Sequence, residues 1–271
     1  MYDILDAIII GIVEGLTEFL PVSSTGHMIL TQQLLGLQKD PVLDSFKIII
    51  QLGAILAIAL VYRKRIYNLF ARDGESGLPG FRKNGLNLIH IALAIVPAMG
   101  LAFVAKDFIK DDGFNTVPVL WALIVGGLFF IFAEKFHPKA TAEDMDQLTY
   151  KQALFIGLFQ CISVLWPGFS RSGSTMAGGL LMGASYKAAA DFSFFIAIPI
   201  MTVATGYELL DSYQYMTSDV MAFFATGFIV SFVVAWIVVV AFLRFIQKIT
   251  LTHFAIYRFI LAALFFLFVL R

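Results

Sequence analysis

Charged residues are scarce in this chain of 271 residues, where they make up 14% of the sequence against 59% that are hydrophobic. A soluble domain usually carries about 25% charged residues, so this chain has too little polar surface to cover a water-soluble core. Its formal net charge is zero, which gives no sign of a nucleic-acid partner. The composition argues against a soluble enzyme and a disordered chain, and predicts an all-α polytopic membrane protein.

Cysteine is almost absent, because Cys161 is the single one in the sequence. One cysteine cannot form an internal disulfide bond, and no Cys and His spacing typical of a zinc site is present. Lys and Arg are also missing before the first apolar run. A secretory signal usually begins with basic residues, so we expect the first apolar segment to remain in the protein.

Long hydrophobic runs are abundant, and a run of roughly 20 residues can cross the hydrocarbon of a bilayer. Six segments are predicted to span: 45–62, 86–105, 117–133, 190–207, 219–243 and 253–270. The regions 4–36 and 152–185 differ, since Pro21 and Pro167, each with small polar residues, interrupt their apolar runs. We interpret both as re-entrant hairpins of two half-helices, because irregular backbone at membrane depth must lie inside protein or beside a cavity. A Pro-kinked spanning helix followed by a loop is the alternative.

The distribution of Lys and Arg predicts the topology, because short cytoplasmic loops are enriched in them. The loops 63–85, 134–151 and 244–252 carry most of the basic residues, whereas 208–219 carries none. Six spans that alternate through these loops place both termini outside the cytoplasm. The first hairpin then enters the membrane from outside, and the second enters from the cytoplasm.

The two interrupted regions also resemble each other. With a shift of 146 residues, AIIIGIVEGLTEFLPVSS (7–24) aligns with ALFIGLFQCISVLWPGFS (153–170), so that Ser24 is paired with Ser170. One hairpin plus three spans crosses the membrane an odd number of times, so the second copy is inverted. Such folds place their site near the midplane, where the broken helices meet. We therefore predict a single integral membrane domain, 1–271, with two inverted repeats: about 1–134 and about 150–271.

Two glutamates lie in the first half-helix. Glu14 and Glu18 are four residues apart and share one helix face. Carboxylates at membrane depth are costly and usually functional, and this pair can hold a divalent cation or act as acid and base. A helix near the surface with both acids solvated is the alternative. The second copy has Gln160 and Val164 at these positions, a difference that a purely structural pair would not require.

A polar cluster follows Pro21 and is predicted to open the second half-helix. It consists of Ser23, Ser24, Thr25, Gly26 and His27. Serine and threonine are natural N-caps, and a helix N-terminus also binds phosphate through its free N–H groups. A Ser–His or His–Glu arrangement can activate a nucleophile. A Ser23 that is only a cap, and a histidine that is only buried and hydrogen-bonded, are the alternatives.

Arg171 occupies the corresponding break of the second hairpin, with no acidic residue near it in the sequence. A guanidinium group binds phosphate through two nitrogens at once, and the neighbouring residues are predicted to complete an anion site: Ser170, Ser172, Gly173, Ser174 and Thr175. An arginine that extends to the membrane surface is the alternative. Arg258 lies in the last predicted span, outside both breaks, so we expect its loss to affect mainly folding.

The stretches EGLTEFLPVSSTGH (14–27) and LWPGFSRSGSTMAGG (165–179) resemble the two signature stretches of the bacterial undecaprenyl-diphosphate phosphatase family, also called the bacitracin-resistance protein. Similar stretches at 46–57 and 254–260 extend the resemblance over nearly the whole chain. It implies a multi-pass enzyme of the bacterial inner membrane that removes the terminal phosphate of undecaprenyl diphosphate. The product is the lipid carrier of peptidoglycan precursors, and its recycling confers bacitracin resistance.

The resemblance also implies roles for particular residues. The family's motifs carry over to Glu14, Glu18, Ser24, Thr25, His27 and Arg171. By the same resemblance, activity requires Mg²⁺ or Ca²⁺ and the site faces the periplasm. We expect Ser24 to be the nucleophile or to position it, His27 or Glu18 to act as base, and Glu14 to hold the metal. Attack by metal-bound water or by His27 itself is left open.

Two other classes of protein are considered. A prenyl-phosphate transporter or flippase could use the same pocket, since inverted repeats with broken helices are common in transporters. The other class of membrane phosphatase has a catalytic His and Asp after an Arg-containing stretch, but the next histidine after Arg171 is His253. The expected partners are a polyprenyl diphosphate lipid, membrane lipids and, in a homodimer, a second copy of the chain.

Overall fold

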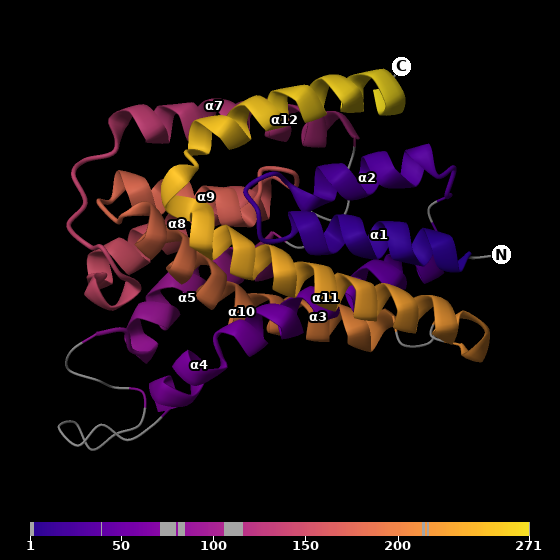
Figure 1. Ribbon diagram of the computed structural model, residues 1–271, viewed down its shortest axis with the longest axis horizontal. Coiled ribbons are helices and arrows are strands. Elements are labelled where there is room, and N and C mark those ends of the chain that lie inside the picture. Colours follow the sequence, from indigo (N-terminus) through magenta and orange to yellow (C-terminus); the bar gives the residue numbers. More distant parts are fainter. Residues whose placement is uncertain are drawn as a thin grey trace.

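The computed structural model describes residues 3–38, 40–70, 80, 85–105, 116–212, 215 and 217–270. Within these ranges the protein is all-helical, with eleven α-helices and no β-strand. Figure 1 shows the long helices lying side by side along the longest axis of the molecule. Five helices of the described part are long and apolar enough to cross a membrane: α3 (Pro41–Val61), α7 (Thr116–Phe136), α10 (Tyr186–Ser212), α11 (Met221–Phe245) and α12 (Leu251–Phe265, continued by a π-helical turn to Leu270).

The sixth predicted span, 86–105, corresponds to α5 (Leu88–Val104). Asn87 begins this helix as its N-cap, in a reciprocal capping box with His90. At 17 residues α5 is shorter than the five candidate spans, of which the shortest, α12 with its π-helical turn, has 20. Residues 106–115, which follow α5, lie outside the described ranges. A multi-pass membrane protein is therefore confirmed by length and composition, with a short sixth apolar helix.

Each interrupted region is a pair of short helices joined by a turn. The first pair is α1 (Ile4–Thr17) and α2 (Ser24–Leu34), and the second is α8 (Tyr150–Leu165) and α9 (Arg171–Leu181). Figure 1 shows α2 lying beside α1 rather than continuing it, and the two helices are in contact. A single kinked helix is thus not what the sequence forms in either region.

The turns of the two pairs end in the same unusual way. Ser23 (φ 74°) and Ser170 (φ 77°) are the two non-glycine residues with positive φ in the described chain. Each accepts a hydrogen bond through its hydroxyl from the N–H three residues later, Gly26 or Gly173, at 3.2 Å. Such backbone strain is rare outside functional sites and costs roughly 1–3 kcal/mol per residue. The prediction that a serine caps the helix after Pro21 is confirmed, and Ser170 caps the helix after Pro167 in the same way.

The pairing of Ser24 with Ser170 is wrong by one residue. Ser23 and Ser170 are both the N-caps of the helices that follow their turns. The offset between these two caps is 147 residues, one more than the offset of 146 between the two prolines. The turn that contains Gly168 has one residue more than the first turn, and Gly168 itself adopts a φ of 94°, which glycine tolerates without strain. An apolar alignment cannot detect a single insertion inside a turn.

Glycines allow the short helix pairs to pack closely on long helices. A Cβ at Gly15 of α1 would lie 2.8 Å from the carbonyl oxygen of Ser231 on α11, and a Cβ at Gly157 of α8 would lie 2.5 Å from that of Ala94 on α5. Small residues at such contacts let helix backbones approach each other in membranes. The first pair is therefore packed on a helix of the second half, and the second pair on a helix of the first half.

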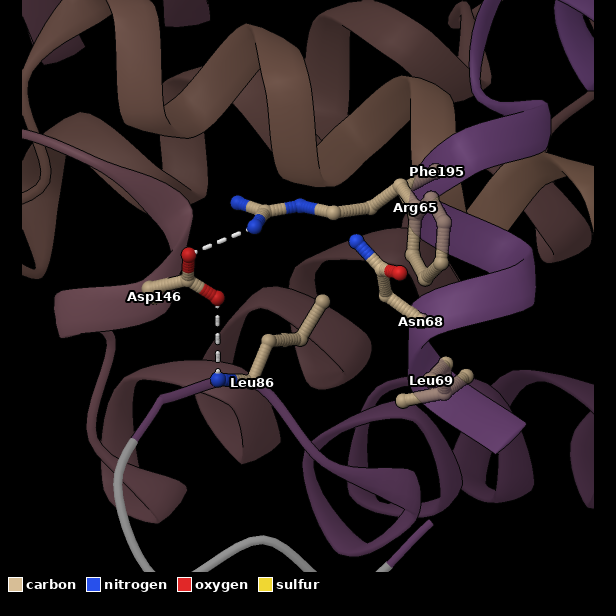
Figure 2. A pocket seen from close by; sticks show the side chains of 6 residues that line it. All are labelled: Arg65, Asn68, Leu69, Leu86, Asp146 and Phe195. Carbon is tan, nitrogen blue, oxygen red and sulfur yellow. Dashed lines mark hydrogen bonds and ion pairs between the residues drawn. The ribbon is translucent and has the colours of Figure 1, made fainter. Parts of the chain in front are cut away.

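Ion pairs join the basic segments at one end of the molecule. Arg65 of α4 (Arg63–Phe70) pairs with Asp146 at 2.6 Å and Asp144 at 3.4 Å, and Figure 2 shows Asp146 also accepting the N–H of Leu86. The Asp144 carboxylate accepts a hydrogen bond from the N–H of Asp146. This bond, together with the positive charges of Lys187 and Arg65, holds the pKa of Asp144 below its ordinary value. Figure 1 places α4 at this end and both termini at the other. The described parts of the basic loops 63–85 and 134–151 thus lie at the same end of the molecule, whereas 71–79 and 81–84 are outside the described residues.

Candidate active site

The two turns meet in the middle of the molecule. Figure 1 shows α1 and α2 approaching from one end, and α8 and α9 from the other. The hydroxyl of Ser172 donates a hydrogen bond to the carbonyl of Leu20 at 3.0 Å, which joins the second turn to the first. The ring of Phe19 packs edge-on against Phe194 of α10, with centroids 5.6 Å apart. The residues at the two sequence breaks are therefore neighbours in space.

Glu18 is at the centre of this junction and contacts both halves. Its Oε2 accepts a hydrogen bond from the Ser24 hydroxyl at 2.7 Å, and its Oε1 pairs with Nη2 of Arg171 at 3.1 Å. The Glu18 side chain is only 8% exposed and that of Arg171 15%. A buried carboxylate needs such partners, because desolvation of an unpaired charge costs several kcal/mol. A nucleophile candidate, a base candidate and a cation are thus connected directly.

Arg171 retains binding capacity beyond this ion pair. Its Nη2 also lies 3.2 Å from the sulfur of Met201, and its guanidinium is 5.9 Å from the ring centre of Phe19. The other terminal nitrogen, Nη1, is buried and has no hydrogen-bond partner among the described residues. A buried donor without a partner is costly, so this nitrogen is suited to a ligand oxygen.

Glu14 is one helical turn before Glu18 and is 4% exposed. Its carboxyl group makes no hydrogen bond to any residue that the structure describes, and no cluster of three or more His, Cys, Asp or Glu occurs in that part of the chain. Magnesium is usually bound by one or two carboxylates together with water and substrate phosphate oxygens. The two glutamates fit an ion of this kind, and do not form a cage made by protein alone.

His27 makes no hydrogen bond to Glu18 or Ser24 among the described residues. Its Nδ1 is 2.7 Å from the carbonyl oxygen of Ser23, and its Nε2 is 2.7 Å from the hydroxyl of Tyr257 on α12. Both ring nitrogens therefore have partners, and neither is the Ser24 hydroxyl. Of the two bases considered from the sequence, Glu18 is the one in contact with Ser24. Thr25 is half-buried, and its hydroxyl has no partner in the described chain.

The hydroxyls of the second turn have partners within the protein. Ser174 and Thr175 both donate to the carbonyl of Arg171 at 2.9 Å, and Thr175 also lies 2.6 Å from the hydroxyl of Ser193. Ser170 caps Gly173, as described above. These groups hold the start of α9 in place, which points to a structural role for them. Arg171 is the member of this set that reaches the other turn.

Comparison with known proteins agrees with this arrangement. A family model described as "Bacitracin resistance protein BacA" matches residues 7–264, which include both turns. The chain belongs to the BacA family. It is also 49% identical, over 271 residues and the full length of both chains, to proteins named "Undecaprenyl-diphosphatase 1" from Bacillus thuringiensis subsp. konkukian (strain 97-27) and Bacillus anthracis. The family resemblance seen in the two motifs is confirmed.

Sequence reasoning missed two residues at the site of this BacA-family protein. Tyr257 holds His27, and Arg258 is fully buried and donates to the carbonyl of Gly168 in the second turn at 3.1 Å. Arg258 lies outside both breaks in the sequence, as predicted, but the packing of α12 brings its guanidinium into contact with the second turn. An arginine inside an apolar span was itself a usable signal.

Proposed function

We propose that this protein hydrolyses undecaprenyl diphosphate to undecaprenyl phosphate and inorganic phosphate, and so recycles the lipid carrier of peptidoglycan synthesis and confers bacitracin resistance. Membership of the BacA family and 49% identity to proteins named undecaprenyl-diphosphatase support this activity. The observation that carries it is the carboxylate of Glu18, which contacts the Ser24 hydroxyl and the Arg171 guanidinium from opposite turns. Phosphoryl transfer depends on such positioning and charge neutralisation.

In the reaction that we propose, the Ser24 oxygen attacks the terminal phosphorus while its proton passes to Glu18. The bond from that phosphorus to the bridging oxygen breaks, and its electron pair leaves with undecaprenyl phosphate. Arg171 holds the transferring group through its free Nη1. Water then attacks the phosphorus, the bond from phosphorus to the Ser24 oxygen breaks, and Glu18 returns its proton to that oxygen, which restores the hydroxyl and the carboxylate and releases inorganic phosphate with the protons of the water. The 2.7 Å contact between Ser24 and Glu18 supports this pairing of nucleophile and base.

The short helices support a re-entrant arrangement. At about 1.5 Å per residue, α1 and α2, with 14 and 11 residues, extend only about 21 and 16 Å, less than the hydrocarbon thickness of about 30 Å. The packing of α1 on α11 and of α8 on α5 supports two inverted repeats, since each pair contacts the helix that corresponds in the other half. Exposed Trp236 and Ile237 on α11 suit contact with membrane lipids. The substrate's tail would lie among such apolar side chains.

We further propose that the site opens to the periplasm of the inner membrane. With basic loops in the cytoplasm, the end that carries both termini is periplasmic. Gln38→Cys, near that end, is then expected to react with an impermeant thiol reagent added outside cells, and Tyr67→Cys on exposed α4 is expected not to react. Both changes belong in a Cys161→Ser background. Labelling of Tyr67→Cys without Gln38→Cys would reverse the proposed orientation.

A divalent cation, Mg²⁺ or Ca²⁺, is proposed to bind at Glu14 and Glu18. When bound, it neutralises negative charge on the diphosphate, a contribution worth several kcal/mol in related chemistry. Excess chelator is therefore expected to lower phosphate release by roughly a hundredfold or more, and added Mg²⁺ or Ca²⁺ to restore it. A wild-type rate in excess chelator would contradict the metal role.

The activity itself is tested with purified protein in detergent and undecaprenyl diphosphate as substrate. We expect release of inorganic phosphate by the wild type, and none above background by Glu18→Gln prepared in the same way. A flippase is the second candidate, because the arrangement of helix pairs supports inverted repeats, which are common in transporters. Transport needs a sealed bilayer whereas hydrolysis does not. Folded wild-type protein that moves the lipid across vesicles but releases no phosphate in detergent would favour the flippase.

A further inference from the structure

Two consecutive residues of α12 reach the two different turns of the site. The hydroxyl of Tyr257 lies 2.7 Å from Nε2 of His27, which follows the first turn. Nη2 of Arg258 donates to the carbonyl of Gly168, inside the second turn. Figure 1 shows α12 lying beside α7, and α12 also contacts α2. One helix thus contacts both halves of the candidate site from outside either hairpin.

The setting of Arg258 is unusual for a charged residue. Its side chain is fully buried, and no carboxylate among the described residues pairs with it. Besides Gly168, its nitrogens donate to the carbonyls of Leu123 at 3.1 Å and Ala122 at 2.7 Å, both on α7. Burial of a charge whose partners are carbonyl groups alone costs folding free energy. We take this cost as a sign that the link that Arg258 makes between α12, α7 and the second turn serves the function of the protein.

Glycine makes room for this guanidinium. A Cβ at Gly126 of α7 would collide with Nη2 of Arg258, and the ring centre of Phe130 lies 5.1 Å from the guanidinium carbon. The second turn is also tied to α7 by Trp166, whose indole N–H donates to the carbonyl of Pro118 at 2.8 Å. The position of Gly168 is therefore determined from two sides, two residues before the cap Ser170 and three before Arg171.

Tyr257 acts on the first turn in a comparable way. His27 is held at both ring nitrogens, by the carbonyl of the strained Ser23 and by the Tyr257 hydroxyl. The two rings are also stacked at 12°, with centroids 5.6 Å apart. Fixing the imidazole fixes the first turn of α2, where Ser24 lies next to the cap.

We propose that Tyr257 and Arg258 are positioning residues, which together set the distance between Ser24 and Glu18 on one turn and Arg171 on the other. The inference rests on the proposed diphosphatase function and adds a helix to its machinery. The reactive groups belong to two separate hairpins, so contacts from a third element, α12, help to keep them aligned. A displacement of about 1 Å can cost a hundredfold in rate.

The test compares Tyr257→Phe, Arg258→Lys and the double variant at matched folded fraction in detergent. We expect kcat to fall about three- to thirty-fold for Tyr257→Phe, which loses one hydroxyl. For Arg258→Lys we expect a fall of about ten- to a hundredfold, because the charge is kept but the separate Nε and Nη2 donors of the planar guanidinium are replaced by one ammonium nitrogen. KM should stay within about threefold, since neither residue is expected to touch the substrate. The double variant should lose less than the product of the single losses, because both act on one distance.

Matched controls are taken from the end of the molecule that carries α4, away from the two turns. Tyr150→Phe removes a hydroxyl that accepts from Asn87 at 2.9 Å, and Arg65→Lys weakens a paired arginine; both should keep kcat within about twofold. Wild-type kcat in both α12 variants would overturn the proposal. So would losses that merely follow the melting temperature and appear equally in the two controls.

Hydrogen exchange gives a readout that does not depend on catalysis. Tyr257→Phe is expected to speed amide exchange in peptides that cover 18–27, and Arg258→Lys in peptides that cover 165–175, with little change elsewhere. Unchanged exchange at both turns would overturn the positioning role whether or not the protein releases phosphate. An inactive wild type whose turns respond as expected would instead contradict the proposed function alone.

Discussion

Glu18→Gln is expected to lower kcat by about 10²- to 10⁴-fold while the protein remains folded. The glutamine oxygen can still accept the hydrogen bond from Ser24, but the amide cannot take its proton. It also cannot neutralise Arg171, so the attack on phosphorus loses both its base and its aligned cation. The measurement is phosphate release from undecaprenyl diphosphate, with thermal unfolding in detergent as the check on folding.

Glu143→Gln is the matched control, because Glu143 is an exposed acid in the segment before α8. Its kcat should equal that of the wild type. Ser24→Ala separates the possible nucleophiles: a loss as large as that of Glu18→Gln supports attack by Ser24, whereas a much smaller loss would favour water with Glu18 as its base. A Glu18→Gln protein with wild-type turnover would remove Glu18 from the reaction.

Among the substitutions, replacement of Arg171 is expected to have the second largest effect. In Arg171→Lys the charge survives, but one ammonium group cannot bond Glu18 through one nitrogen and a phosphate oxygen through another. Loss of a charge-assisted hydrogen bond predicts a fall in kcat/KM of roughly ten- to a hundredfold. Arg171→Ala should lose more, because it also leaves Glu18 without its cation.

The kinetics of both variants are compared with Arg65→Lys, which changes an ion-paired arginine at the end of the molecule remote from the turns. That control should retain its efficiency. Near-normal kcat/KM in Arg171→Lys would show that only the charge matters, and a fully active Arg171→Ala would exclude this residue from the site. Neither result would affect the assignment of the chain to its family.

Several features followed directly from local sequence. The six apolar helices lie where long hydrophobic runs were found, because hydrocarbon selects for length and composition. Proline and small polar residues ended α1 and α8 near Pro21 and Pro167, and serine capped the helices that follow. These properties depend on a residue and its neighbours within a few positions, so a single sequence determines them.

Other features depended on contacts between distant segments. The pairing of Glu18 with Arg171 spans 153 residues, and that of His27 with Tyr257 spans 230. Nothing in a motif shows which partner each hydroxyl will find, so the contact of Ser24 with Glu18, and that of Ser172 with the carbonyl of Leu20 in the other turn, could not be read from the sequence.

The sequence alone determined that the protein is an apolar helical membrane protein with two polar breaks rich in phosphate-binding residue types. Only the tertiary structure decided that Glu18, and not His27, contacts Ser24, and that Arg258 belongs beside the second turn. The physical reason is that composition and helix propensity act locally, whereas hydrogen-bond partners of buried groups are chosen by how the helices pack.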